Sequence, residues 1–148
     1  DDLEHFDGTR FITGSVRMGG REGHRDDIVR GAGAPPLKTP SGWLLFYHGM
    51  SSKEPDVGYK VGAMLLDLSD PTEVLCRSSY PILAPKEWYE HDWKPNGVMA
   101  TGAVVVGEDL LVYYGGGDKY VAAAKANLRD FVRKLQSDEH IVLRPVTL

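Results

Sequence analysis

The segment from residue 30 to residue 49, RGAGAPPLKTPSGWLLFYHG, constrains the fold of this chain more than any other part of it. Two short runs, 37–39 and 43–47, stand on either side of a Pro-Ser-Gly turn. Runs of this kind separated by such a turn are typical of a β-hairpin, and Gly42 suits the positive φ that hairpin turns often need. The sequence therefore predicts a hairpin that delivers His48 at the end of its second strand.

The residues that flank this hairpin are of types that often serve in binding rather than only in folding. Gly31 and Gly33 belong to a predicted glycine-rich loop, in which the backbone can approach a ligand or a neighbouring strand closely. Arg30 and His48 stand at the two ends of the segment. We interpret the segment as the floor of a binding site.

The remaining sequence predicts mostly strands. Residues 18–27, MGGREGHRDD, are polar and glycine-rich, and we expect them to form a loop that does not pack against the core. Short apolar or alternating runs bounded by turn residues predict strands over 59–68, 72–77, 98–106, 110–114 and 120–126, and a final strand over 140–148 that Pro145 interrupts.

One helix is predicted near the end of the chain. Leu128, Phe131, Val132 and Leu135 recur at the spacing of a single helical face. Asn127 directly precedes them and is a suitable N-cap.

The predicted elements repeat, because a hairpin followed by further strands begins near residue 30 and again near residue 96. Repeated units of this kind are typical of the blades of a β-propeller, which are four-stranded sheets of about 40–45 residues. At that size the 148 residues make about three blades, whereas closed propellers typically have about 4–8. We therefore expect a single all-β domain over residues 1–148, forming part of a propeller.

Composition excludes several classes of function. A net charge of −4 argues against a nucleic-acid surface, and no apolar run approaches the length of a membrane span. Cys76 is the single cysteine, which excludes an internal disulfide and favours a reducing compartment, so a cytoplasmic location is expected. The histidines at 24, 91 and 140 lack the spacing of a metal site, and no metal is expected.

Four blocks of sequence, in order, resemble glycoside hydrolase family 130, the mannoside phosphorylases and related β-mannosidases. The first is GAGAPPLKT followed by GWLLFYHG at 31–49, and the second is YKVGA with LLDLSDP at 59–71. The third combines PIL at 81–83, YE at 89–90 and PN at 95–96. The fourth combines GAVV at 102–105, YYG at 113–115 and Asp118.

The resemblance implies a fold and a reaction. The family fold is a five-bladed β-propeller, of which this chain resembles the C-terminal half. Its phosphorylases use inorganic phosphate as co-substrate, with no further cofactor, to cleave β-1,4-mannosides with inversion and release mannose 1-phosphate. Their general acid is a single Asp in the N-terminal half, and no counterpart is found here, so no catalytic residue is assigned to this chain.

The resemblance also implies a set of binding residues. His48 and Tyr59 match residues of the phosphate pocket, and Asp118 matches an acid that holds mannose hydroxyls. The family usually has a phosphate-binding lysine at the position of Val29. Arg30 is the candidate substitute, but neighbouring strand residues point to opposite faces unless a β-bulge shifts the register.

Two alternatives to a phosphorylase stay open. Loss of the lysine at Val29 favours a β-mannoside hydrolase that uses water in place of phosphate. The missing acid and missing blades favour a non-catalytic, sugar-binding half-propeller. Open blade edges tend to pair with another chain, so we expect either self-association or a missing N-terminal half.

The irregular segment 78–95 holds three large aromatic residues and two acids. Trp88, Tyr89 and Trp93 are suited either to flank a saccharide or to hold the loop in place, and we favour the second role. Glu90 and Asp92 have the types of an acid/base pair for glycoside chemistry. Two acids in a polar loop are usually solvated, and that is our expectation for both.

Overall fold

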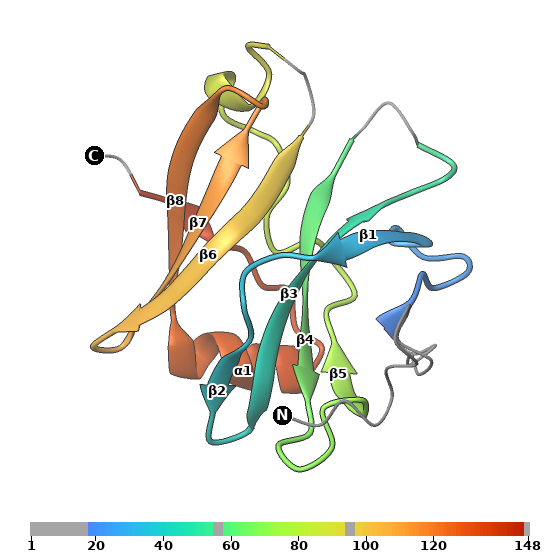
Figure 1. Cartoon of the computed structure of the whole chain (residues 1–148), viewed down its shortest axis with the longest axis vertical. Coiled ribbons are helices and arrows are strands. Elements are labelled where there is room, and N and C mark those ends of the chain that lie inside the picture. Colours follow the sequence, from blue (N-terminus) through green and yellow to red (C-terminus); the bar gives the residue numbers. More distant parts are fainter. Residues whose placement is uncertain (1–17, 55–57, 94–96, 147–148) are drawn as a thin grey trace, which may run out of the picture.

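The computed structural model describes residues 18–54, 58–93 and 97–146, which form two antiparallel sheets that stand side by side (Figure 1). The first sheet has the order β1-β3-β4-β5, with β2 also paired to β3. Its strands are β1 (Ile28–Ala32), β2 (Leu37–Thr39), β3 (Gly42–Met50), β4 (Lys60–Leu66) and β5 (Val74–Arg77). The second sheet has the order β6-β7-β8-β9. Its strands are β6 (Val98–Val106), β7 (Asp109–Gly116), β8 (Tyr120–Asn127) and β9 (Arg144–Pro145).

The predicted hairpin is confirmed as β2 and β3, which pair from Leu37 opposite Leu44 to Thr39 opposite Gly42. Gly42 has a φ of +146°, and a Cβ at this position would lie 2.4 Å from the carbonyl oxygen of Leu66. Only glycine satisfies both conditions without strain. The Thr39 hydroxyl closes the turn by donating to the Gly42 carbonyl at 2.7 Å.

The strand β1 is not among the predicted strands, and the glycine-rich loop is predicted to include Gly31. The structure shows that this expectation is wrong at Gly31, because residues 28–32 pair with the upper half of β3 from Ile28 opposite Met50 to Ala32 opposite Tyr47. The pairing arises because β3 extends to Met50 and offers a free edge to any extended segment. A register shift between Val29 and Gly31 marks a β-bulge at Arg30.

The second sheet confirms the predicted meander, since β6, β7 and β8 pair in sequence. The predicted helix is α1 (Leu128–Gln136), and the side chain of Asn127 caps it by accepting from the backbone N–H of Asp130 at 3.0 Å. Within the described part of the predicted final strand, residues 140–146, Arg144 and Pro145 pair with β8, and the N–H of Val146 donates to the carbonyl of Ala123 at 2.8 Å. In the described part of the chain, no helix is long and apolar enough to cross a membrane.

The core lies between the two sheets and over α1. Alternate residues of β3 and β4 point into it, as do the inner faces of β6, β7 and β8 and the apolar face of the helix. Phe46 of β3 and Phe131 of α1 meet edge to face with ring centres 6.2 Å apart. The opposite face of the first sheet carries a second, smaller apolar cluster of Leu45, Tyr47, Met64 and Leu66.

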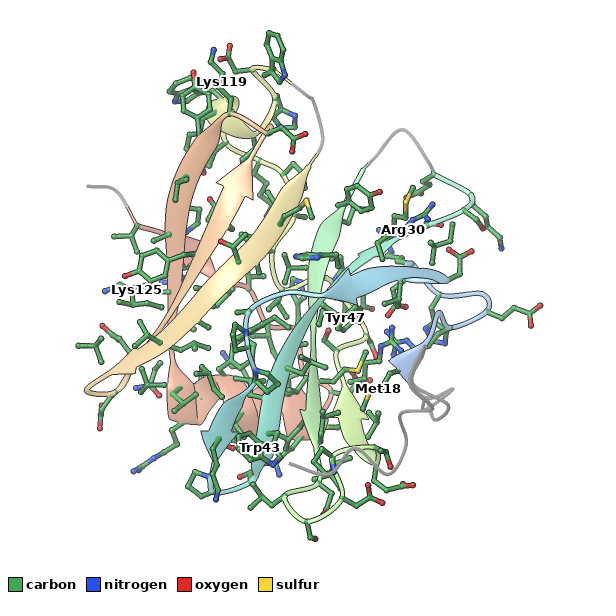
Figure 2. The ribbon with its side chains drawn as sticks, viewed as in Figure 1. Met18, Arg30, Trp43, Tyr47, Lys119 and Lys125 are labelled. Atoms are coloured by element: carbon green, nitrogen blue, oxygen red, sulfur yellow. The ribbon has the colours of Figure 1, made fainter. Side chains whose placement is uncertain are left out.

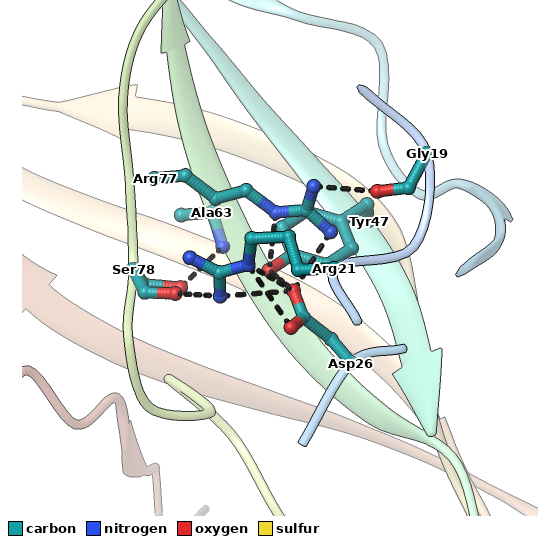
Figure 3. Close-up of polar contacts among 7 residues, drawn as sticks. All are labelled: Gly19, Arg21, Asp26, Tyr47, Ala63, Arg77 and Ser78. Atoms are coloured by element: carbon teal, nitrogen blue, oxygen red, sulfur yellow. Dashed lines mark hydrogen bonds and ion pairs between the residues drawn. The ribbon is translucent and has the colours of Figure 1, made fainter. Parts of the chain in front are cut away.

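The loop at 18–27 packs against this second face, so the expectation that it stays unpacked is wrong (Figure 3). Asp26 is only 8% exposed, and its carboxylate accepts from Arg21 at 3.0 Å and from the Tyr47 hydroxyl at 2.7 Å. Arg77 of β5 forms an ion pair with the same carboxylate at 2.7 Å and donates to the Gly19 carbonyl. Asp26 is therefore buried because Arg21, Tyr47 and Arg77 satisfy its carboxylate, whereas Glu22, His24 and Arg25 of the same loop are exposed.

Glu90 is also buried, at 1% exposure, so the expectation that it is solvated is wrong. It ends the short 3₁₀ helix η3 (Trp88–Glu90). Its carboxylate accepts from the backbone N–H groups of Lys86 and Glu87, and from the hydroxyl of Tyr114 at 2.8 Å. Asp92 is exposed and pairs with Lys119, as expected of a solvated acid.

Candidate functional site

The start of β6 joins the candidate site residues at one end of the two sheets. The backbone N–H of Val98 donates to the carbonyl of Tyr59 at 3.2 Å, and Gly97 accepts from Gly117 at 3.1 Å. The carbonyl of Ala100 lies 3.1 Å from Nε2 of His48. Residues 97–100 are therefore bonded to His48, to Tyr59 and to the glycine that precedes Asp118.

His48 enters from β3, where alternation with Tyr47 turns its ring toward the second sheet. The ring is 5% exposed, and burial lowers the pKa of His48 although the Ala100 carbonyl opposes that shift. The ring is therefore neutral at neutral pH. A neutral imidazole has one N–H, and Nε2 carries it when that atom donates to the carbonyl of Ala100.

Arg30 lies on β1 at the bulge and is exposed (Figure 2). A bulge places two residues of one strand opposite one residue of its partner, so simple alternation does not separate Arg30 from Val29. Gly31 follows with a φ of +127°, which favours glycine. At Gly33 a Cβ would lie 3.0 Å from the Ala100 carbonyl and 3.4 Å from Nε2 of His48, so glycine permits this close approach.

Tyr59 and Asp118 complete the set. Tyr59 directly precedes β4 and is half-buried. Asp118 lies in the turn between β7 and β8 with a φ of +57°, is exposed, and is adjacent to Lys119 at the upper end of Figure 2. Gly117 packs closely against the backbone of Tyr89 and Glu90. A Cβ at this position would lie 2.9 Å from the carbonyl oxygen of Tyr89. The position of Asp118 thus depends on the segment that holds Glu90.

Trp88, Tyr89 and Tyr120 form an aromatic cluster beside this turn, and the sequence did not predict that these three rings meet. Trp88 meets Tyr89 and Tyr120 edge to face, at 5.7 Å and 5.4 Å between ring centres. The Tyr120 hydroxyl donates to Asp92 at 2.8 Å. Trp88 is 69% exposed even so. Tyr120 lies in a strand of small residues, and no local signal indicated this contact.

The described residues contain no group of three or more His, Cys, Asp or Glu side chains placed to hold a metal ion. Cys76 is half-buried on β5, and burial raises the pKa of its thiol, so it is a weak nucleophile. The chemistry that this end of the sheets can offer is hydrogen bonding and charge: the guanidinium of Arg30, the imidazole of His48, the phenol of Tyr59 and the carboxylate of Asp118.

The chain was compared with known protein families and with individual relatives. Residues 1–137 match the model of a family described as beta-1,4-mannooligosaccharide phosphorylase, glycoside hydrolase family 130. A beta-1,2-mannobiose phosphorylase from Listeria innocua is 37% identical over 136 residues, which are 91% of this chain and 36% of that protein. A beta-1,4-mannooligosaccharide phosphorylase from Ruminococcus albus is 32% identical over 143 residues, 95% of this chain and 41% of that protein.

Solved structures agree with the sequence comparison. The Listeria innocua beta-1,2-mannobiose phosphorylase, solved with beta-1,2-mannobiose, superposes with a TM-score of 0.71 at 38% identity. The superposition covers 80% of this chain and 33% of that one, so the chain spans about a third of such relatives. The predicted fold class is confirmed, since these relatives are five-bladed β-propellers and the two sheets described here match part of one. The chain therefore belongs to glycoside hydrolase family 130.

Proposed function

We propose that this chain forms a sugar- and phosphate-binding wall of a β-mannoside phosphorylase, which releases mannose 1-phosphate. The observation that carries the proposal is the bonding of residues 97–100 to His48, Tyr59 and Gly117 at one end of the sheets. These hydrogen bonds link the segments that carry His48, Tyr59 and Asp118, which supports the proposal. The names of the family and of its relatives support the reaction.

Each residue has a distinct role in this proposal. Arg30 supplies a guanidinium, which suits phosphate because its donors lie in a planar fork. Phosphate beside His48 would favour the protonated ring, in which both nitrogens donate and the bond to Ala100 is kept. Asp118 accepts hydrogen bonds from sugar hydroxyls. No general acid is assigned within this chain, so catalysis requires a carboxylate from elsewhere in the active protein.

A hydrolase is the second candidate, and Val29 is the observation that favours it. This residue stands where the family usually has lysine, and it packs against the apolar cluster on the outer face of the first sheet. The bulge at Arg30 supports the phosphorylase, because it removes the alternation that would turn Arg30 away. One solved relative, 30% identical with a TM-score of 0.65, is described as coming from a family of mannoside phosphorylases that also contains glycoside hydrolases.

Substrate binding and turnover test the proposal. We expect the chain to bind β-mannobiose and phosphate, and His48→Ala and Asp118→Asn to weaken the phosphate and sugar affinities by about tenfold or more, the scale of one charged hydrogen bond. Calorimetry measures these affinities. Asp109→Asn is the matched control, because Asp109 is an exposed acid at the opposite end of β7. Unchanged affinity in both site variants would remove these residues from the site.

The reaction and the linkage need separate substrates. Phosphate-dependent formation of mannose 1-phosphate indicates a phosphorylase, whereas free mannose without phosphate indicates a hydrolase. Assays should include β-1,4- and β-1,2-mannobiose, because the relatives carry both linkages in their names. Sugar binding without turnover is the result expected of a chain that lacks the general acid.

We also propose that the outer face of the second sheet is covered in the active protein, by further blades or by another copy. Large apolar side chains are exposed on these strands, with Val121 at 83% and Val106 at 60%. An apolar face of this kind is typical of an interaction surface. We expect the isolated chain to self-associate in sedimentation experiments, and Val121→Glu to reduce the association. A monomer at every concentration would contradict this.

A further inference from the structure

A second pocket lies beside the start of β4, and none of Arg30, His48, Tyr59 and Asp118 lines it. Residues 80–84 run beside the start of β4, where Val61 exchanges backbone hydrogen bonds with Leu83 and Ile82. Between this segment and the C-terminal residues 140–145 is a pocket of about 380 Å³. Its size falls within the range typical of small-molecule sites.

Lys60 is the unusual residue of this pocket. It is 8% exposed, and it also borders a smaller cavity beside Asp26. Within residues 18–54, 58–93 and 97–146, its ammonium group makes no hydrogen bond or ion pair that satisfies it, although Glu54 lies near enough to favour the charge. Burial lowers the pKa of Lys60, and the neighbouring Arg25 lowers it further. Burial therefore removes part of the hydration of this ammonium group at the edge of the pocket, and an anion bound there would replace that hydration.

The charges around Lys60 are those of an anion site. Arg25, Lys86 and Arg144 also line the pocket, against the two acids Glu87 and Glu90. The Glu90 carboxylate is already bonded to two backbone N–H groups and the Tyr114 hydroxyl. Asp26, across the smaller cavity, is bonded to two arginines and Tyr47. Positive charge therefore gathers here on a chain whose net charge is −4.

One rim of the pocket is aromatic. Tyr80 and His140 meet edge to face, with ring centres 5.3 Å apart, and both line the pocket. Tyr80 is 53% exposed, so its ring is available for contact. An aromatic face beside a cationic pocket suits a molecule that carries both a ring and an anionic group.

We propose that Lys60 and Arg25 bind a phosphate group in this pocket, either as inorganic phosphate or as a phosphate monoester of a small cyclic molecule such as a sugar. The pocket is distinct from the candidate site, because Lys60 alternates with Val61, which faces the core on the same side as His48. The proposal goes beyond the function proposed above and does not depend on it.

The experiment is a titration of the full, ¹⁵N-labelled chain with inorganic phosphate and with mannose 1-phosphate, followed by NMR. The His48→Ala background isolates the second pocket, and Lys60→Met is then expected to lower phosphate affinity about tenfold or more. Lys60→Arg should keep most of the affinity because it keeps the charge. Lys53→Met, an exposed lysine outside both pockets, is the control and should change nothing.

The two phosphate sources give different results. Tighter binding of mannose 1-phosphate, lost on Tyr80→Ala, assigns the pocket to a phosphate monoester, whereas equal affinities assign it to inorganic phosphate. If Lys60→Met fails to fold, Arg25→Gln at the exposed rim tests the same pocket. Unchanged affinity in the Lys60 or Arg25 variant overturns the inference. A failure of the candidate site would instead appear as unchanged binding on His48→Ala alone.

Discussion

Asp26→Ala is expected to lower the free energy of unfolding by about 3–5 kcal/mol, the cost of removing one partner of a buried ion pair. The carboxylate of Asp26 is bound to Arg21 on one side and to Arg77 on the other, and the Arg77 side chain is only 5% exposed. Without Asp26, Arg77 keeps its charge in a buried site beside the Tyr47 ring, whose centre lies 4.4 Å from its guanidinium carbon. The Tyr47 hydroxyl also loses its acceptor.

Urea denaturation of the variant and of a control measures this loss. Glu22→Ala is the control, because Glu22 is an exposed acid of the same loop and its removal changes the net charge equally. We expect its free energy of unfolding to match that of the parent chain. Asp26→Asn should fall between the two, since an amide oxygen still accepts hydrogen bonds but carries no charge. A loss below about 1 kcal/mol in Asp26→Ala would show that the network does not hold the loop.

Acid provides a second readout of the same network. Burial alone would raise the pKa of Asp26, but hydrogen bonds from Arg21 and Tyr47 and the charge of Arg77 outweigh it and lower the pKa. The unfolded chain therefore takes up this proton at a higher pH than the folded chain. The stability that Asp26 contributes is present above the pKa of Asp in the unfolded chain, about 3.9. It is lost as the pH falls through the lower pKa of Asp26 in the folded chain. Asp26→Asn should lack this part of the acid sensitivity.

The parts of the fold that the sequence predicts are those that local patterns specify. The apolar spacing of Leu128, Phe131, Val132 and Leu135 predicts α1, and the Pro-Ser-Gly turn predicts the β2–β3 hairpin. Each pattern lies within one element, and the structure confirms both. The same holds for the meander of β6, β7 and β8, whose turns contain glycine next to acidic residues.

The parts that the sequence does not predict depend on partners far along the chain. Asp26 is buried because Tyr47, 21 residues later, donates to it, and Arg77 binds Tyr47 across a further 30 residues. No window around residue 26 contains that information. The strand β1 likewise forms because β3 is long enough to pair with it. The polarity of residues 18–27 therefore predicts an unpacked loop only because the partners that bury Asp26 lie outside that segment.

The candidate site divides in the same way. Motifs name His48, Tyr59 and Asp118, and the start of β6 is bonded to His48, to Tyr59 and to Gly117, which precedes Asp118. Arg30, the candidate substitute for the missing lysine, lies on β1 at the bulge. What the motifs omit is the support beneath Asp118, where Gly116 and Gly117 rest on Tyr89 and Glu90. A Cβ at Gly116 would lie 3.2 Å from Cγ of Glu90. The buried acid therefore packs against the backbone of the turn that carries Asp118.

Glu90→Ala is expected to lower the free energy of unfolding by about 3 kcal/mol, because two backbone N–H groups and the Tyr114 hydroxyl lose their acceptor. Burial and the neighbouring Tyr89 and Glu90 hold the pKa of Tyr114 above its usual value, so its hydroxyl remains a donor that needs a partner. Glu90→Gln keeps an acceptor and should lose less. Asp92→Asn, an exposed acid in the same segment, is the control and should lose least.

The effect of Glu90→Ala should also reach the turn that carries Asp118. Once the segment at 86–90 loosens, the amides of Gly116 and Gly117 should exchange with solvent faster, while those at the opposite end of β7 keep their protection. Sugar affinity, measured with β-mannobiose, should fall in the same variant and recover in Glu90→Gln. Faster exchange with unchanged affinity would separate Asp118 from sugar binding, whereas unchanged exchange would show that the turn holds its conformation without Glu90.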